Sequence, residues 1–202
     1  MDIGSAAAVA RAIALAIALA ACAGLRAWLP LLLVGISARL GILTLEPPWR
    51  FLESNQALAL FGLATAIEVL GDKIAAVDHA LDAVSTVLRP AAGSLLAASV
   101  LSFVHDPLLA VVAGVVIGAP TALVPHAAKS GLRLSSTGLT AGLANPLLSL
   151  VEDLASLILF VLAVLVPLLA ALLCAAVIVF LLLRVSRHRP ACLDTVATPP
   201  VR

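Results

Sequence analysis

From Leu154 to Leu183 the chain runs for 30 residues without one charged side chain. As one uninterrupted helix at 1.5 Å per residue this run would be about 45 Å long, whereas the hydrocarbon core of a bilayer is about 30 Å thick. Pro167 lies inside the run, and proline interrupts the hydrogen-bond ladder of a helix. The run therefore predicts membrane-spanning structure that either breaks near Pro167 or protrudes well beyond the bilayer.

The rest of the chain is also strongly apolar. Of its 202 residues 63% are hydrophobic and 11% are charged, and a soluble domain of this size has too little interior to bury so much apolar surface. High hydrophobicity also excludes intrinsic disorder, and a net charge of +1 with 3% aromatic residues argues against nucleic-acid binding. Three cysteines cannot form a disulfide framework. We therefore predict an all-α, polytopic integral membrane helix bundle.

The apolar segments follow one another with only short interruptions, which indicates one domain. Residues 1–189 are predicted to form this single integral membrane domain with five or six membrane helices, and residues 190–202 a disordered C-terminal tail. Arg184, Arg187 and Arg189 directly follow the last apolar run. Because positively charged residues beside a membrane helix favour the cytoplasmic side, we expect a cytoplasmic C-terminus.

Capping residues and prolines indicate where helices begin. Asn55 is a predicted N-cap for a helix that runs to about Gly71, and Pro107 is predicted to start another helix after a turn. Asn145-Pro146 combines a capping residue with a first-turn proline, so a helix is expected to begin there as well. Residues 130–145, in contrast, are rich in Gly, Ser and Thr, which indicates a loop or a re-entrant segment buried in protein.

Polar residues recur at helical spacing in four otherwise apolar segments. A spacing of three, four or seven residues places side chains on one face of a helix. The four predicted stripes are Thr65, Glu68 and Asp72; Asp78, Asp82, Ser85 and Arg89; His126, Lys129 and Arg133, if the helix persists to Arg133; and Asn145, Ser149, Glu152 and Ser156. An ionised side chain at the bilayer centre costs about 2.5–3.5 kcal/mol on insertion scales. The stripes are therefore expected to face a protein interior, a water-filled cavity or the interface.

Glu68 and Glu152 are embedded in apolar sequence, so both are expected to be buried and paired. Two simpler interpretations stay open for other charges: residues 78–89 as an amphipathic helix on the membrane surface, and Lys129 with Arg133 as ordinary loop charges. The predicted polar site consists of Glu68, Asp72, Lys73, Asp78, His79, Asp82, Arg89, His126, Lys129, Arg133, Asn145, Glu152 and Asp153. We expect the helix around Glu68 to meet the helix that begins at Asn145, so that one site forms near the midplane.

Several short strings together resemble a known family. They are Gly24-Leu25-Arg26-Ala27-Trp28-Leu29-Pro30, Glu68-Val69-Leu70-Gly71-Asp72-Lys73, Arg89-Pro90-Ala91-Ala92-Gly93 and Gly142-Leu143-Ala144-Asn145-Pro146, and they resemble the bacterial membrane family catalogued as domain of unknown function 4126. The resemblance covers about residues 20–185. It implies a multi-pass protein of the bacterial inner membrane and supplies no activity.

A short internal echo accompanies these strings. Gly24-Leu25-Arg26 recurs as Gly131-Leu132-Arg133, each after an Ala-rich segment. Inverted repeats with broken helices are a common plan of secondary transporters, so the echo is read as a weak inverted repeat.

Three classes of function fit these patterns. The first is transport of a small ion or solute by a channel or secondary carrier, with Glu68, Asp72 and Glu152 carrying protons or a cation and the basic residues as counter-charges. The second is a membrane scaffold whose buried ion pairs fix helix packing. The third is an intramembrane enzyme acting on lipid headgroups through a cation held by Asp72, Asp78 and Asp82. No cofactor is expected, and the expected partners are the lipid bilayer, a small ion or solute, and a second copy of the chain.

Overall fold

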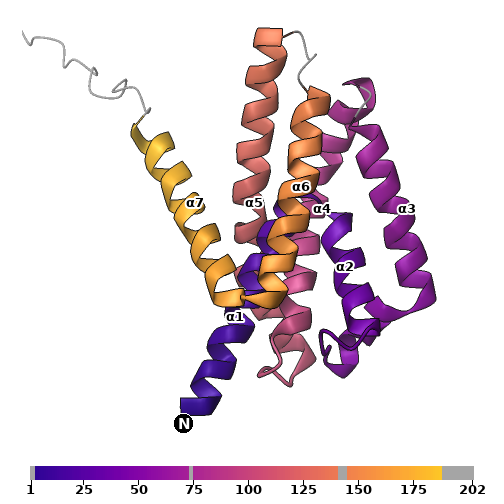
Figure 1. Ribbon diagram of the computed structural model, residues 1–202, viewed down its shortest axis with the longest axis vertical. Helices are drawn as coiled ribbons and strands as arrows, with labels where there is room; N and C mark the ends of the chain where they lie inside the picture. Colours follow the sequence, from indigo (N-terminus) through magenta and orange to yellow (C-terminus); the bar gives the residue numbers. More distant parts are fainter. Residues whose placement is uncertain (1–2, 73–74, 141–144, 188–202) are drawn as a thin grey trace, which may run out of the picture.

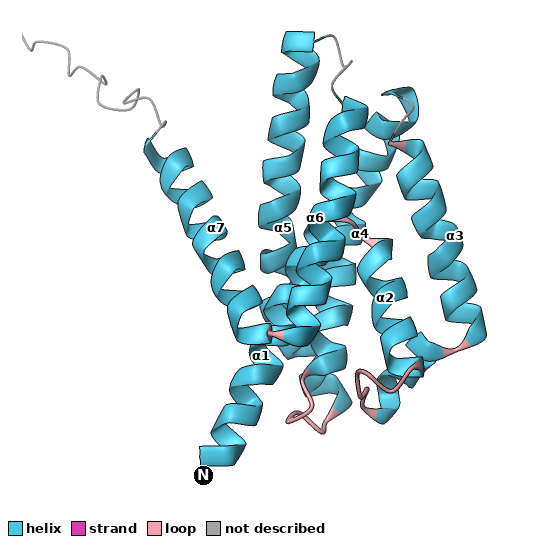
Figure 2. Cartoon of the chain, viewed as in Figure 1, coloured by secondary structure: helices cyan, strands magenta, loops and turns pink. Residues whose placement is uncertain are grey.

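A computed structural model describes residues 3–72, 75–140 and 145–187, and these residues are almost entirely helical (Figure 1, Figure 2). The described part of the chain contains no strand, which confirms the all-α prediction. Its elements are α1 (Ile3–Leu25), α2 (Trp28–Arg39), the short 3₁₀-helix η1 (Pro47–Glu53), α3 (Asn55–Gly71), α4 (Ala75–Val100), α5 (Pro107–Thr140), α6 (Asn145–Leu165) and α7 (Pro167–Arg187).

The 30-residue apolar run is divided between two helices. α6 ends at Leu165 and α7 begins at Pro167, so the break near this proline is the one of the two predicted alternatives that the structure shows. Pro167 stands at the first position of α7, where its missing N–H costs no helical hydrogen bond. The two helices then run in opposite directions, and α7 diverges from α5 toward the C-terminus (Figure 1).

Two predictions of local structure are wrong. Ser54, not Asn55, caps α3, because the Ser54 hydroxyl accepts a hydrogen bond from the Ala57 N–H at 3.2 Å. Asn55 is the first residue of the helix, and its side chain accepts a hydrogen bond from Arg39 at 2.6 Å. Residues 130–140, predicted as a loop or re-entrant segment, continue α5 instead. The remaining part of that segment, residues 141–144, lies outside the described residues.

The interior of the bundle depends on close approach between α1, α4 and α5. A Cβ atom added to Gly118 of α5 would collide with the carbonyl oxygen of Gly93 in α4, and one added to Gly24 of α1 would collide with the carbonyl oxygen of Ala122 in α5. Glycine therefore allows backbone-to-backbone packing at both crossings. Because these helices lie so close together, only small apolar side chains fit along most of their contact.

The chain turns back on itself inside the bundle between α1 and α2. α1 ends at Leu25 and α2 begins at Trp28, so only Arg26 and Ala27 separate the two helices. α2 begins about half-way up the bundle and runs back toward the end where α1 started (Figure 1). A turn at this depth frees backbone groups in the interior of the bundle.

The bundle differs from a soluble protein in its apolar surface and in the charges buried beside its hydrophobic core. Large apolar residues are exposed along α3, α5, α6 and α7, whereas several arginines, carboxylates and a lysine are buried. Among the described residues three helices are long and apolar enough to cross a membrane: Gly4–Leu25, Pro107–Ser136 and Pro146–Leu165. Shorter apolar helices accompany them. This arrangement is that of a helical membrane protein.

Candidate functional site

Eight charged side chains from α3, α4, α5 and α6, from the residue after α3 and from the α1–α2 turn meet inside the bundle. We call this group the buried charge cluster; it consists of Arg26, Glu68, Asp72, Arg89, Lys129, Arg133, Glu152 and Asp153. It forms where α3 ends, where α6 begins and where α1 gives way to α2. Asp72, directly after α3, and Glu152, in the first half of α6, are joined through the cations Lys129 and Arg133.

Asp72 lies at the centre of the cluster. One of its carboxylate oxygens, Oδ2, is contacted by three cations from different parts of the chain. Arg26 donates a short hydrogen bond to it, Arg133 lies at 2.9 Å, and the Lys129 ammonium lies at 3.6 Å. Each of these three cations offsets part of the cost of burying the Asp72 charge.

Glu152 shares two of these cations with Asp72. Its Oε2 atom lies 2.8 Å from Lys129 Nζ and 2.9 Å from Arg133 Nη2. Lys129 and Arg133 stand four residues apart on α5 and are nearly fully buried, so the interpretation of them as loop charges is wrong. Each of the two cations therefore contacts two carboxylates, one from α3 and one from α6.

Arg26 is fully buried and joins α6 to the cluster. Its Nε lies 2.6 Å from Asp153 Oδ1, and its Nη2 donates hydrogen bonds to the Ser149 hydroxyl at 2.8 Å and to the Ser149 carbonyl at 3.3 Å. Arg26 is absent from the polar site predicted from the sequence, because it belongs to no stripe. The sequence feature that points to Arg26 is its position as an isolated charge between two apolar segments. It also lies in the Gly-Leu-Arg string that recurs at Arg133.

Glu68 accepts hydrogen bonds from backbone N–H groups at the α1–α2 turn. Its two carboxylate oxygens accept hydrogen bonds from the N–H groups of Ala27 at 3.1 Å and Trp28 at 3.3 Å. Arg89 lies 3.7 Å from Glu68 and donates a hydrogen bond to the Gly24 carbonyl at 2.9 Å. Glu68 and Arg89 thus satisfy both ends of the turn, and a carboxylate occupies the positive N-terminal end of α2.

The formal charges of the cluster balance, with four cations and four carboxylates. Asp72 is shared by Arg26, Lys129 and Arg133, so these charges do not divide into separate pairs. Glu68 and Arg89 balance each other. Glu152 and Asp153 are the least buried members, with 12% and 22% of their side chains exposed.

Other predicted site residues have different surroundings. His126 is buried, and its Nε2 atom lies 3.3 Å from the Thr86 hydroxyl. Ser85 and Arg89 are buried, so this part of α4 packs in the bundle and does not lie on a membrane surface. Lys73 lies outside the described residues, as do the side chains of Asp78, His79, Asp82 and Asn145.

The described residues hold no group of three or more His, Cys, Asp or Glu side chains arranged to bind a metal. The carboxylates of the cluster are instead separated by cations. Asp72 meets three basic groups, and Glu152 meets two. The chemistry available to this arrangement is exchange of partners between fixed charges and transfer of protons to or from a carboxylate.

The comparison with known families agrees with the resemblance noted in the sequence. Residues 13–188 match the family described as "Domain of unknown function (DUF4126)". The chain belongs to the DUF4126 family. The matched region of this DUF4126 protein includes the whole buried charge cluster, Arg26 among its members. No curated protein and no solved structure matches the chain.

Proposed function

We propose that this protein transports a small ion or solute across the bacterial inner membrane, and that the buried charge cluster is the site through which transport occurs. The observation that carries the proposal is the sharing of Lys129 and Arg133 between Asp72 and Glu152. A cation with two carboxylate partners on different helices can move from one to the other without being left unpaired. Such a pair of alternative contacts is the kind of two-state element that alternating access requires.

The α1–α2 turn supports the same proposal. Discontinuous helices whose N-terminal ends point at an anionic group inside the bundle are a recurrent feature of secondary transporters. Here the N–H groups of Ala27 and Trp28 point at the Glu68 carboxylate, beside the other charges of the cluster. An anionic solute, or a proton delivered to Glu68, would weaken this attachment and change the position of α2.

For the topology we propose that α3 to α7 cross the membrane and that α1 with α2 forms a re-entrant hairpin. In this arrangement the α1–α2 turn, rather than residues 130–145, is the re-entrant segment. The C-terminal end of α7 and the C-terminal end of α3 lie toward the same end of the bundle, opposite the start of α3 (Figure 1). A cytoplasmic C-terminus then places the buried charge cluster in the cytoplasmic half of the bilayer.

Reporter fusions test this orientation. A phosphatase that is active only outside the cytoplasm, fused after Arg187, is expected to be inactive, because arginines at the end of α7 favour the cytoplasmic side. The matched fusion after Ser54, at the start of α3, is expected to be active. A fluorescent protein that matures only in the cytoplasm should give the opposite pattern. Phosphatase activity after Arg187 would reverse the proposed topology.

A flux assay tests the transport proposal. Wild-type protein in liposomes is expected to dissipate a proton or ion gradient when a pH-sensitive dye is followed over a panel of salts. Glu152→Gln removes the charge that Lys129 and Arg133 share with Asp72, and is expected to lower the flux by at least about tenfold. Glu53→Gln in η1, the same chemical change away from the cluster, should leave the flux unchanged.

The balance of four cations and four carboxylates favours a second candidate, a scaffold whose charges only fix helix packing. The flux assay separates the two, because a scaffold moves no ion in wild type and shows no difference between Glu152→Gln and Glu53→Gln. The charge swap Lys129→Glu with Glu152→Lys does not distinguish a scaffold from a transport protein. Glutamate at position 129 would lie beside Asp72, and lysine at position 152 would lie beside Arg133, so the exchanged pair would meet like charges in either case.

A further inference from the structure

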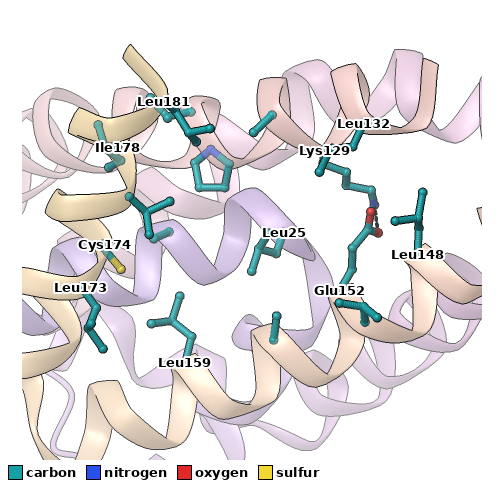
Figure 3. A pocket seen from close by; sticks show the side chains of 17 residues that line it. Leu25, Lys129, Leu132, Leu148, Glu152, Leu159, Leu173, Cys174, Ile178 and Leu181 are labelled. Carbon is teal, nitrogen blue, oxygen red and sulfur yellow. Dashed lines mark ion pairs between the residues drawn. The ribbon is translucent and has the colours of Figure 1, made fainter. Parts of the chain in front are cut away.

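A pocket of about 370 Å³ opens beside the buried charge cluster, between α1, α5, α6 and α7 (Figure 3). Its volume is at the lower end of the range for small-molecule sites. The pocket is lined by Ala21, Leu25, Val124, Pro125, Ala128, Lys129, Leu132, Leu148, Val151, Glu152, Ala155, Leu159, Leu173, Cys174, Val177, Ile178 and Leu181. Lys129 and Glu152 are the only charged residues in this lining.

The polar and apolar parts of the lining are separated in space. Lys129 and Glu152 face each other at one end of the pocket, while Leu173, Cys174 and Ile178 of α7 line the other end (Figure 3). A ligand that fills such a pocket has one polar group and a longer apolar body. A wholly polar solute would leave the aliphatic walls without partners, and a pure hydrocarbon would cover the charged end without satisfying it.

Lys129 has hydrogen-bonding capacity at this end. It is 3% exposed and lines the pocket, and an ammonium group has three N–H donors. Its Nζ atom makes ion-pair contacts with Glu152 at 2.8 Å and Asp72 at 3.6 Å. Within the described residues it donates no hydrogen bond of good geometry. A ligand oxygen in the pocket would supply an acceptor for this buried donor.

The buried donor at this end favours a group with charged acceptor oxygens. The two charged residues of the lining, Lys129 and Glu152, balance each other, and Asp72 lies 3.6 Å from Lys129 Nζ outside the lining. Neither carboxylate accepts a hydrogen bond of good geometry from Lys129. A ligand carboxylate on the pocket side of Lys129 would accept such a bond, and a charge-assisted hydrogen bond is about twice as strong as a neutral one.

We propose that this pocket binds a long-chain fatty acid, with its carboxylate at Lys129 and its alkyl chain along α6 and α7. The volume suits one alkyl chain rather than the two chains of a diacyl lipid. The bilayer around the apolar faces of α5, α6 and α7 supplies such amphiphiles directly. This binding site goes beyond the proposed transport function and does not depend on it, because binding can be measured without any flux.

Photolabelling in phosphatidylcholine nanodiscs tests the site. A fatty acid with a diazirine on its alkyl chain is expected to label wild-type protein saturably at residues of the pocket lining on α6 and α7. An excess of unlabelled fatty acid should compete about tenfold better than the alcohol of the same chain length, because the alcohol lacks the charge that Lys129 binds. Labelling spread over the outer face of α3, around exposed Leu63, would overturn the proposal.

Two neighbouring alanines of α5 provide matched variants. Ala128→Leu fills the pocket, whereas Ala127→Leu makes the same change at an exposed position outside it. We expect saturable labelling to fall about tenfold in the first and to stay at the wild-type level in the second, with equal melting temperatures. Lys129→Met should remove the preference for the acid over the alcohol. Equal labelling of Ala128→Leu and Ala127→Leu, or competition by diacyl phosphatidic acid but not by fatty acid, would contradict the site.

Discussion

Replacing Arg26 with methionine is expected to lower the free energy of unfolding by about 3–5 kcal/mol, because it removes a fully buried cation from two carboxylates. Asp72 keeps Lys129 and Arg133 as neighbours, but Asp153 loses the contact at 2.6 Å, and Ser149 loses the donor for its hydroxyl and its carbonyl. The loss is a large fraction of the total stability of a typical protein. It should appear as a fall in melting temperature of roughly 10 °C.

The measurement is thermal unfolding of the purified protein in a mild detergent. Arg39→Met is the matched control, because Arg39 is exposed and its side chain bonds Asn55 at the surface; its melting temperature should stay close to that of wild type. Arg26→Lys retains the charge without the planar fork of donors, so it should recover only part of the loss. Equal melting of Arg26→Met and Arg39→Met would show that Arg26 does not stabilise the bundle.

Glu68→Leu and Arg89→Leu are each expected to lower the free energy of unfolding by about 3–5 kcal/mol. The double variant is expected to lower it by less than the sum of the two single effects. Glu68→Leu removes the acceptor for two N–H groups of the α1–α2 turn and leaves the buried Arg89 without this carboxylate. Arg89→Leu removes the donor to the Gly24 carbonyl. In the double variant no charge of this pair remains buried, so one part of the penalty disappears.

A double-mutant cycle measures this coupling through the unfolding free energies of the four proteins. We expect an interaction energy of about 1–3 kcal/mol, which is typical of contacting residues in one network. The pair Glu68 and Arg39 serves as the comparison, because Arg39 contacts Asn55 and is remote from the turn; its cycle should be additive. Additive effects of Glu68→Leu and Arg89→Leu would mean that the contact at 3.7 Å contributes nothing to the stability of the turn.

Periodicity explains why much of the site could be predicted. The polar stripes on α3, α5 and α6 were found from spacing alone, and Glu68, Asp72, Lys129, Arg133 and Glu152 do meet in the bundle. In apolar sequence a charged residue must turn inward, so its helix face reveals the direction of the interior. The same reasoning could not include Arg26, because a single charge in a two-residue turn has no period.

The sequence by itself determined that this chain is a helical membrane protein with charges inside, since no other structure can accommodate so few polar residues among so many apolar ones. For the apolar run at residues 154–183 the sequence left two alternatives, a break near Pro167 or a protrusion beyond the bilayer, and the structure shows the break. Only the tertiary structure decided that α5 continues through the Gly- and Ser-rich residues 130–140. There Arg133 is held by Asp72 of α3 and Glu152 of α6, contacts that offset the weak local preference for helix. It alone also decided which charges pair and that the chain turns back at Arg26, because both depend on neighbours far away in the sequence.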